Sequence, residues 1–321
     1  MKKRRSRMTK IVVVISAFIM ILSSGCITFA GEYSANLSIG CTQKSVETIK
    51  TKQIDLIADK EEEVIITNEG KPIESDILDE TAKKAGNKVF GVFASKKGDV
   101  NYQLYIISND EEMKISDIVE KINKYSKNEN ELKASSTNSY YRDYNWNLRY
   151  SNKVDYVTIT TTVHLSRKSS NANINGSTGS VWDIISSTQT EATDTYIREH
   201  YTRLSANQPN QKLVDWGPEG SNQTGSVSVS LNSMGVAAAS YSFNIGNFTV
   251  TDLSSKSEKY GRWKFDTSKQ KRTLKTKPGI RVTNTKGDLY IDVSHSIYQY
   301  IPNAWGQKLY TGEVRIIVPD R

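Results

Sequence analysis

Three histidines, His164, His200 and His295, are the residues of this sequence best suited to acid–base or metal chemistry. Their spacing matches no zinc motif, and the sequence has no Cys-x-x-Cys pair, nucleophile elbow, phosphate-binding loop or dinucleotide-binding fingerprint. Glu199 precedes His200, but neighbours on a strand point to opposite faces, so the two do not form a dyad. We therefore expect no catalytic site, no metal site and no cofactor. A hydrolase based on carboxylate pairs is kept as a third alternative.

A different chemistry, insertion into a membrane, is suggested by the uncharged segment from Ser226 to Thr251. It alternates apolar and small polar residues, which is the pattern of a transmembrane β-hairpin. The positions that would face lipid are Val227, Val229, Leu231, Tyr241, Phe243 and Ile245. This uncharged, alternating pattern resembles the stem hairpins of leucocidin-type and aerolysin-type toxins, and the resemblance implies a β-pore-forming toxin.

The predicted register of this segment gives a three-stranded meander. Ser233–Gly235 is predicted as a three-residue loop, which places Leu231 opposite Ala237. A two-residue turn at Gly246 then begins a third strand, unless a bulge takes its place. The first arm alternates only over Ser226–Leu231, whereas a tilted spanning strand needs about 9–11 residues. The pattern thus favours a soluble sheet packed on a core, with the pore stem as the alternative.

Basic residues are concentrated between Lys256 and Lys286, where eleven Lys or Arg face two acids. Trp263 and Phe265 alternate with cations and are predicted to face the core. The cations that remain are Lys269, Lys271, Arg272, Lys275 and Lys277. They could bind an anionic cell-surface polymer or a membrane surface. Lysines on an exposed edge strand also prevent aggregation without any ligand, so both interpretations stay open.

The N-terminus is typical of an exported protein. Six basic residues among the first ten precede an uncharged run from Ile11 to Ala30, which is the pattern of a secretory signal peptide. Cleavage near Ala30 predicts a secreted protein. Cys26 ends a segment that resembles a lipobox, so a lipid anchor at Cys26 is the alternative, and an uncleaved anchor is a third possibility. If cleavage follows Ala30, Cys41 has no partner, and no disulfide framework is expected.

The net charge of +8 owes six charges to this leader, so the mature chain is nearly balanced. Residues 31–135 are net acidic and residues 136–321 are net basic. The high isoelectric point therefore does not indicate nucleic acid, and no nucleic-acid partner is expected. The oligomeric state is not predicted.

The elements that must position these residues fall into two groups. The predicted order is a signal peptide at 1–30, a polar lead at 31–60, a small acidic α+β domain at 61–127, a linker at 128–139 and a basic β-sandwich domain at 140–321. The small domain reads β-α-β-β-α, with Ser75 and Ser116 as helix N-caps. The segment Ser180–Leu204 has no clean period and is predicted as a loop or short helix followed by a strand.

Strands with one apolar face, separated by turns, predict an antiparallel sandwich or barrel for the second half, and we expect the sandwich. One predicted strand places Leu289, Ile291, Val293, Ile297 and Ile301 on its apolar face and Tyr290, Tyr298 and Tyr300 on the other. The expected function is that of an exported, non-enzymatic binding protein acting at the cell envelope or a target surface through the basic sandwich. A β-pore-forming toxin is the alternative.

Overall fold

The computed structural model describes residues 12–15, 48–49, 64–97, 100–126, 139–149, 156–193, 195–300 and 306–320. Cys26, Cys41 and Ala30 lie outside the described residues, so the predictions on cleavage and lipidation stay predictions. No helix in the described ranges is long and apolar enough to cross a membrane.

The first part of the chain contains short strands and two helices. Their bounds are β1 (Val12–Ile15), β2 (Thr48–Ile49), β3 (Val64–Thr67), β4 (Glu74–Ser75), α2 (Glu80–Lys84), β5 (Lys88–Lys97), β6 (Val100–Ser108) and α3 (Ile115–Ser126).

The second part is built of strands with one short 3-10 turn. Their bounds are β7 (Ser139–Arg149), β8 (Tyr156–Ile174), β9 (Ser177–Ala192), β10 (Tyr196–Ser205), β11 (Gln211–Gly217), β12 (Ser221–Leu231), η3 (Ser233–Gly235), β13 (Ala239–Asp252), β14 (Tyr260–Asp266), β15 (Thr273–Thr276), β16 (Gly279–Asn284), β17 (Leu289–Tyr300) and β18 (Gln307–Val318).

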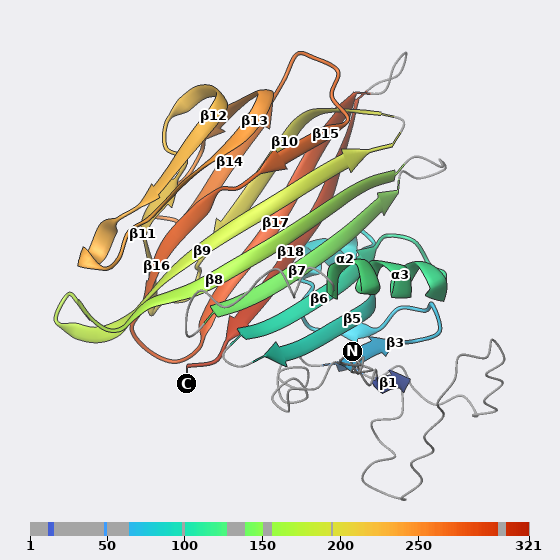
Figure 1. Cartoon of the computed structure of the whole chain (residues 1–321), viewed down its shortest axis with the longest axis horizontal. Coiled ribbons are helices and arrows are strands. Elements are labelled where there is room, and N and C mark those ends of the chain that lie inside the picture. Colours follow the sequence, from blue (N-terminus) through green and yellow to red (C-terminus); the bar gives the residue numbers. More distant parts are fainter. Residues whose placement is uncertain are drawn as a thin grey trace, which may run out of the picture.

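Two large sheets face each other across one apolar core (Figure 1). The larger sheet has the order β1-β3-β5-β6-β7-β8-β9-β16-β11, with β15 also paired to β9. The smaller sheet has the order β12-β13-β14-β10-β17-β18. The prediction of a mainly β protein with a sandwich is confirmed.

Alternation along the long strands creates the core. Every predicted apolar position of β17 that the structure describes is buried, and Ile301 lies outside the described residues. Tyr298 and Tyr300 point to the other face and are exposed, as predicted. Each buried Val, Leu or Ile side chain contributes roughly 1.5–3 kcal/mol, so these inner faces hold the sheets together.

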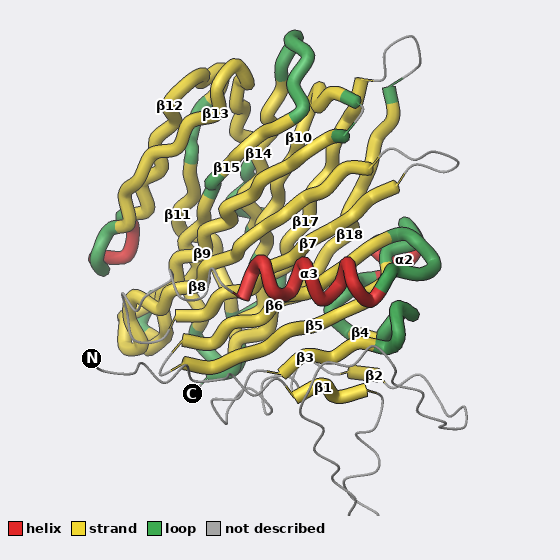
Figure 2. Tube along the Cα trace, turned by 45° about the vertical axis from the view of Figure 1, so that its right-hand side comes forward, coloured by secondary structure: helices red, strands yellow, loops and turns green. Residues whose placement is uncertain are grey.

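The small unit shows the predicted order β-α-β-β-α in β3, α2, β5, β6 and α3, with the two-residue strand β4 as an unpredicted addition before α2. Helix α3 covers the outer face of the larger sheet (Figure 2), where Ile118 and Ile122 are buried among aromatic side chains. Strands β6 and β7 pair in parallel, so one continuous sheet runs through both predicted domains. The domain boundaries themselves stay predictions.

The predicted N-caps of both helices are wrong. Helix α2 begins after Asp79, whose carboxylate accepts a hydrogen bond from the Ala82 amide at 2.7 Å. Ser75 lies in β4, before the helix. The residues between Ser75 and Asp79 run along the edge of β18, where Leu78 pairs with Val314. Ser116 lies inside α3, which begins at Ile115.

The predicted loop or helix after Ser180 is also wrong, because β9 is a continuous strand paired with β8, β15 and β16. The inner face of β9 does not show the alternation of apolar residues expected of a strand, because the inward-facing positions include the buried polar residues Ser186, Thr188 and Thr190. The predicted strand that follows is confirmed as β10.

Candidate functional site

Strands β12 and β13 form a hairpin at one side of the molecule (Figure 1). Ser226–Leu231 pair with Ala239–Asn244 in antiparallel register. Strand β13 pairs with β14 only through Thr249–Asp252, and β12 has no other partner among the described strands. The distal part of the hairpin therefore has ladder hydrogen bonds only within itself.

The predicted register of the hairpin is wrong by two residues. Leu231 lies opposite Ala239 instead of Ala237, because the loop is longer than three residues. Met234 and Gly235 both have a positive φ within it. A shift of two residues leaves every side chain on its predicted face, so the division into an apolar and a serine face survives the error.

The predicted third strand is absent from the described hairpin, and the bulge named as its substitute is present. Thr224 pairs with Thr249, and Ser226 pairs with Asn244, so several residues of β13 oppose Gly225 alone. Gly246 adopts φ +63° in this bulge. The wide bulge turns both Ile245 and Phe248 toward the core.

The arms are longer than the sequence predicts. Strand β12 has 11 residues and β13 has 14. Strand β12 as a whole reaches the length of about 9–11 residues that a tilted transmembrane strand needs. This weakens the length argument against a membrane role, but the uninterrupted ladder still covers only Ser226–Leu231. The sequence suggested turn material before Ser226, but β12 already begins at Ser221, because its first residues pair with the end of β13.

In this structure the apolar face of the hairpin rests on the sandwich core. Val227, Val229 and Leu231 are fully buried, Ile245 is buried, and Tyr241 and Phe243 are half-buried. The exposed face carries Ser226, Ser228, Ser230, Ser242 and Asn244. The predicted membrane-hairpin residues are thus brought together on one face, with their side chains held away from solvent.

The tip of the hairpin is held by a buried carboxylate of β11. Asp215 accepts hydrogen bonds from the backbone amides of Asn232 at 2.8 Å and Ser233 at 3.1 Å. It also accepts one from the Ser233 hydroxyl at 3.0 Å. Hydrogen bonds to a charged acceptor are roughly twice as strong as neutral ones, so Asp215 fixes the start of the loop.

A buried ion pair holds the other side of the tip. Arg281 of β16 donates from Nε and Nη2 to the two carboxylate oxygens of Asp183, at 2.6 and 2.9 Å. Its Nη1 and Nη2 also donate to the carbonyls of Ser233 and Ala237, each at 2.8 Å. The side chains are 0% and 1% exposed. We call Asp183, Asp215 and Arg281 the tip latch.

Tyr241 connects the hairpin to the basic segment. Lys277 Nζ lies 5.0 Å from the centre of the Tyr241 ring, so the two predicted sites are in contact. The Tyr241 hydroxyl is buried and has no hydrogen-bond partner among the described residues. Burial raises the pKa of Tyr241, and the nearby charge of Asp183 raises it further.

The other predicted surface cations lie along an edge of the larger sheet. Among the described strands β15 pairs only with β9, and Lys275 is exposed on it. Lys269 and Arg272 are exposed and Lys271 is half-buried. Trp263 and Phe265 lie in the core, as predicted.

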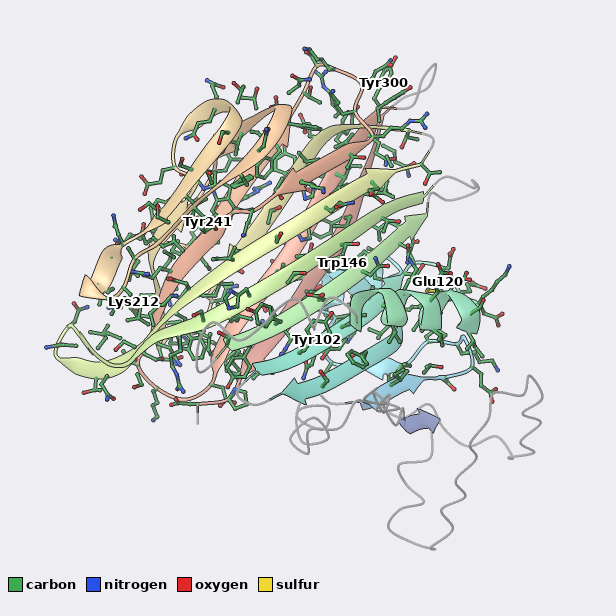
Figure 3. All side chains as sticks on the ribbon, in the orientation of Figure 1. Tyr102, Glu120, Trp146, Lys212, Tyr241 and Tyr300 are labelled. Carbon is green, nitrogen blue, oxygen red and sulfur yellow. The ribbon has the colours of Figure 1, made fainter. Side chains whose placement is uncertain are left out.

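Tyrosines that the sequence analysis did not assign to a site lie close to these cations. The guanidinium of Arg272 lies 5.5 Å from the ring centre of Tyr196, which pairs with the exposed Tyr300 at the end of β17 (Figure 3). Tyr298 and Tyr310 are exposed on β17 and β18. Tyr298 and Tyr300 could have been found from the sequence, because both lie on the predicted outer face of β17. We call Tyr196, Tyr300 and the neighbouring cations Lys271, Arg272 and Lys275 the surface of tyrosines and cations.

His200 and His295 were also missed as a pair. His200 Nε2 lies 3.1 Å from His295 Nδ1 in the core of the sandwich. The signal was present in the sequence, because His295 falls in the apolar register between Val293 and Ile297. In the described residues no group of three or more His, Cys, Asp or Glu could hold a metal ion.

No protein-family model matches the sequence, and no curated protein matches it. Among solved structures, a pore-forming protein matches at a TM-score of 0.32 with 8% identity, covering 56% of this chain and 89% of the other. Clostridium perfringens delta-toxin matches at 0.29 with 11% identity, covering 58% and 90%. The membrane-inserted form of the Clostridium perfringens NetB toxin matches at 0.25 with 6% identity, covering 56% and 94%. At TM-scores this low, neither fold nor function follows from these similarities.

Proposed function

We propose that this chain is an exported β-pore-forming protein whose β12–β13 hairpin leaves the sandwich and enters a membrane. The observation that carries the proposal is the pairing of the distal hairpin with itself alone. Such a hairpin can move with the ladder hydrogen bonds between its arms intact, and only four backbone groups of its loop lose their bonds to Asp215 and Arg281. That matters because unsatisfied backbone groups cost several kcal/mol each inside a bilayer.

The side chains of the hairpin support the same proposal. One face is apolar and suits lipid, whereas the other carries serines and asparagine and suits a water-filled lumen. No charged residue occurs from Ser221 to Thr251. A strand packed on a soluble core needs an apolar inner face, but its outer face can carry charged residues. The uncharged outer face of small polar residues is therefore an additional property, and it is one that a membrane barrel requires.

In the resting structure the tip latch restrains the hairpin, whereas one buried hydroxyl group destabilises its position. The tip latch restrains the loop through hydrogen bonds from Arg281 and to Asp215. The buried, unpartnered hydroxyl of Tyr241 costs roughly 1–3 kcal/mol, which release into a hydrated interface would return. The hairpin is therefore held by the five hydrogen bonds of its tip to Asp215 and Arg281 and by apolar burial that lipid can replace.

The proposal predicts that the purified mature chain releases a trapped dye from anionic liposomes and forms heat-stable oligomers on them. Both results follow from a hairpin that inserts and pairs with hairpins of other copies, because a barrel leaves no unpaired edge. The measurement is fluorescence dequenching together with unheated gel electrophoresis. Binding to the liposomes without leakage would contradict a pore and favour the second candidate.

The second candidate is the binding function expected from sequence, without insertion. The observation in its favour is the surface of tyrosines and cations, where Arg272 lies against Tyr196 and Tyr196 pairs with the exposed Tyr300. Amphipathic tyrosine rings and flexible cations suit the interface of an anionic membrane. This surface would serve a pore former as its first contact, so the two candidates differ only in the step after binding.

Changing Lys271, Arg272 and Lys275 to Glu is expected to weaken binding to anionic liposomes at least tenfold. Each cation near an anionic surface contributes about 1 kcal/mol, and reversal replaces attraction with repulsion. Liposome flotation at low salt measures the effect. The control changes Lys83, Lys84 and Lys114, exposed in the small unit, to Glu, so it carries the same net charge. Equal loss in both variants would show that net charge, not this surface, drives binding.

A further inference from the structure

His200 and His295 are the central members of a polar chain that joins the two sheets. Both rings project inward from the smaller sheet, His200 from β10 and His295 from β17. Their facing nitrogens, Nε2 and Nδ1, are 3.1 Å apart, which is a hydrogen-bond distance. Both side chains are completely or almost completely buried.

The larger sheet supplies hydroxyls to the outer nitrogens of the pair. Thr190 Oγ1 lies 2.9 Å from His200 Nδ1, and Thr161 Oγ1 lies 3.0 Å from His295 Nε2. Thr161 continues to Thr188 at 3.1 Å. Thr202 Oγ1 lies 3.3 Å from both histidines. A hydrogen-bonded path therefore runs from β9 through both rings to β8.

The groups that face the pair are neutral. Trp146 of β7 and Phe265 of β14 contact the rings edge-on, and the hydroxyls come from β8, β9 and β10. Thr311 of β18 bonds the backbone of His295. None of these described contacts is charged, and only the two histidines can titrate. Glu199 and Tyr201 flank His200 but point to the opposite face of β10.

We propose that the His200–His295 pair is a pH-dependent lock between the two sheets, closed at neutral pH and opened by acid. Between two neutral rings, one facing nitrogen carries the hydrogen and the other accepts it. When both rings are protonated, two N–H groups face each other at 3.1 Å. The two positive charges then lie in a core with no described carboxylate beside them.

The direction of the pH effect follows from linkage. Burial lowers the pKa of His200 to about 3, and burial together with the charge of His200 lowers the pKa of His295 well below its usual range. An unfolded histidine has a pKa of about 6.5. The unfolded chain therefore binds more protons below about pH 6.5, and the stability present above that pH is lost as the pH falls.

The size of the effect depends mainly on the unfolded pKa. Between pH 7.5 and 5, each histidine raises the unfolding equilibrium constant about 30-fold, and the pair raises it about 1,000-fold. The hairpin packs on this same core through Val227. A loosened sandwich would release the hairpin more readily, and this second step alone rests on the proposed function.

The test is urea unfolding of the full mature chain at pH 7.5 and pH 5, for the wild type and for His200→Gln/His295→Gln. Acidification from pH 7.5 to pH 5 is expected to raise the unfolding equilibrium constant about 1,000-fold less in this variant than in the wild type. His164→Gln is the control. Burial lowers the pKa of His164 to about 4, aided by Lys168 and Lys277, so this single change should remove only about 30-fold. An unchanged pH dependence in the double variant would overturn the lock.

A second measurement applies even where the double variant does not fold. Carbon-13 NMR of labelled histidines in the folded wild type should show both buried rings neutral at pH 5. Protonation near pH 6.5 in the folded state would contradict the proposal. Dye release at pH 5 and 7.5 then tests the link to the hairpin separately: loss of stability without faster leakage would keep the lock and reject that link.

Discussion

Replacing Arg281 with methionine is expected to lower the free energy of unfolding by about 3–5 kcal/mol. Arg281 is buried and makes a two-pronged ion pair with Asp183. Methionine has a similar length but leaves the Asp183 carboxylate in the core without that partner. Lys168 lies 3.8 Å from Asp183 and compensates only in part, since its side chain is partly exposed. Urea denaturation near pH 7.5 measures the change.

Two variants show whether the loss comes from the stranded charge. Arg281→Met/Asp183→Leu should recover much of the stability, because apolar side chains often replace a buried ion pair without net cost. Lys83→Met breaks the exposed pair between Lys83 and Glu80 and should change stability by less than about 1 kcal/mol. If Arg281→Met costs no more than Lys83→Met, the tip latch does not stabilise the fold.

The Arg281 variant should also act locally. The carbonyls of Ser233 and Ala237 lose their donor, so amide hydrogen exchange in the hairpin should become faster than in β17. The double variant should restore global stability without restoring these two bonds. Fast exchange in its hairpin at near-normal stability would separate the latch from the rest of the core.

Much of the hairpin could be predicted from sequence, because alternation has a period of two. The apolar residues of its paired arms point to the face that the pattern indicates, even though Leu231 lies opposite Ala239 instead of the predicted Ala237, which is exposed in the loop. The predicted loop around Met234 is too short, because the length of the loop depends on the left-handed conformation of Met234, which no sequence pattern reveals. Register errors of two residues are invisible to alternation.

The tip latch could not be predicted, because its members are far apart in the chain. Asp183, Asp215 and Arg281 come from three strands, and only pairing of β9, β16 and β11 brings them together. The unclear pattern of β9 had a related cause. Its inward Thr188 and Thr190 belong to the polar chain around the histidines, so a strand with a polar inner face looked like a loop.

A disulfide between residues 217 and 229 is expected to abolish dye release until it is reduced. A Cβ built on Gly217 lies 3.4 Å from the Val229 Cβ, close to the separation of about 3.5–4.5 Å in disulfides. Gly217 ends β11, and Val229 lies in the distal part of β12. Gly217→Cys/Val229→Cys therefore ties the hairpin to the opposite sheet. Changing Cys41 to Ser prevents other pairings in the mature chain, which lacks Cys26 when cleavage follows Ala30.

The matched control places the same bond inside the hairpin. Ser228 and Ser242 face each other across β12 and β13, so Ser228→Cys/Ser242→Cys joins the two arms without joining them to the sandwich. This hairpin can still leave as a unit. Oxidised control protein should release dye as fast as reduced control protein, which excludes a general effect of oxidation.

The central claim is that the hairpin must leave the sandwich for the protein to act on a membrane. The most direct measurement is dye release by Gly217→Cys/Val229→Cys on anionic liposomes, before and after addition of dithiothreitol, with free thiols titrated in both states. We predict no leakage while the tether is closed and full leakage after reduction. Leakage at the same rate in both states would contradict the claim, because the membrane would then be breached with the hairpin still in place.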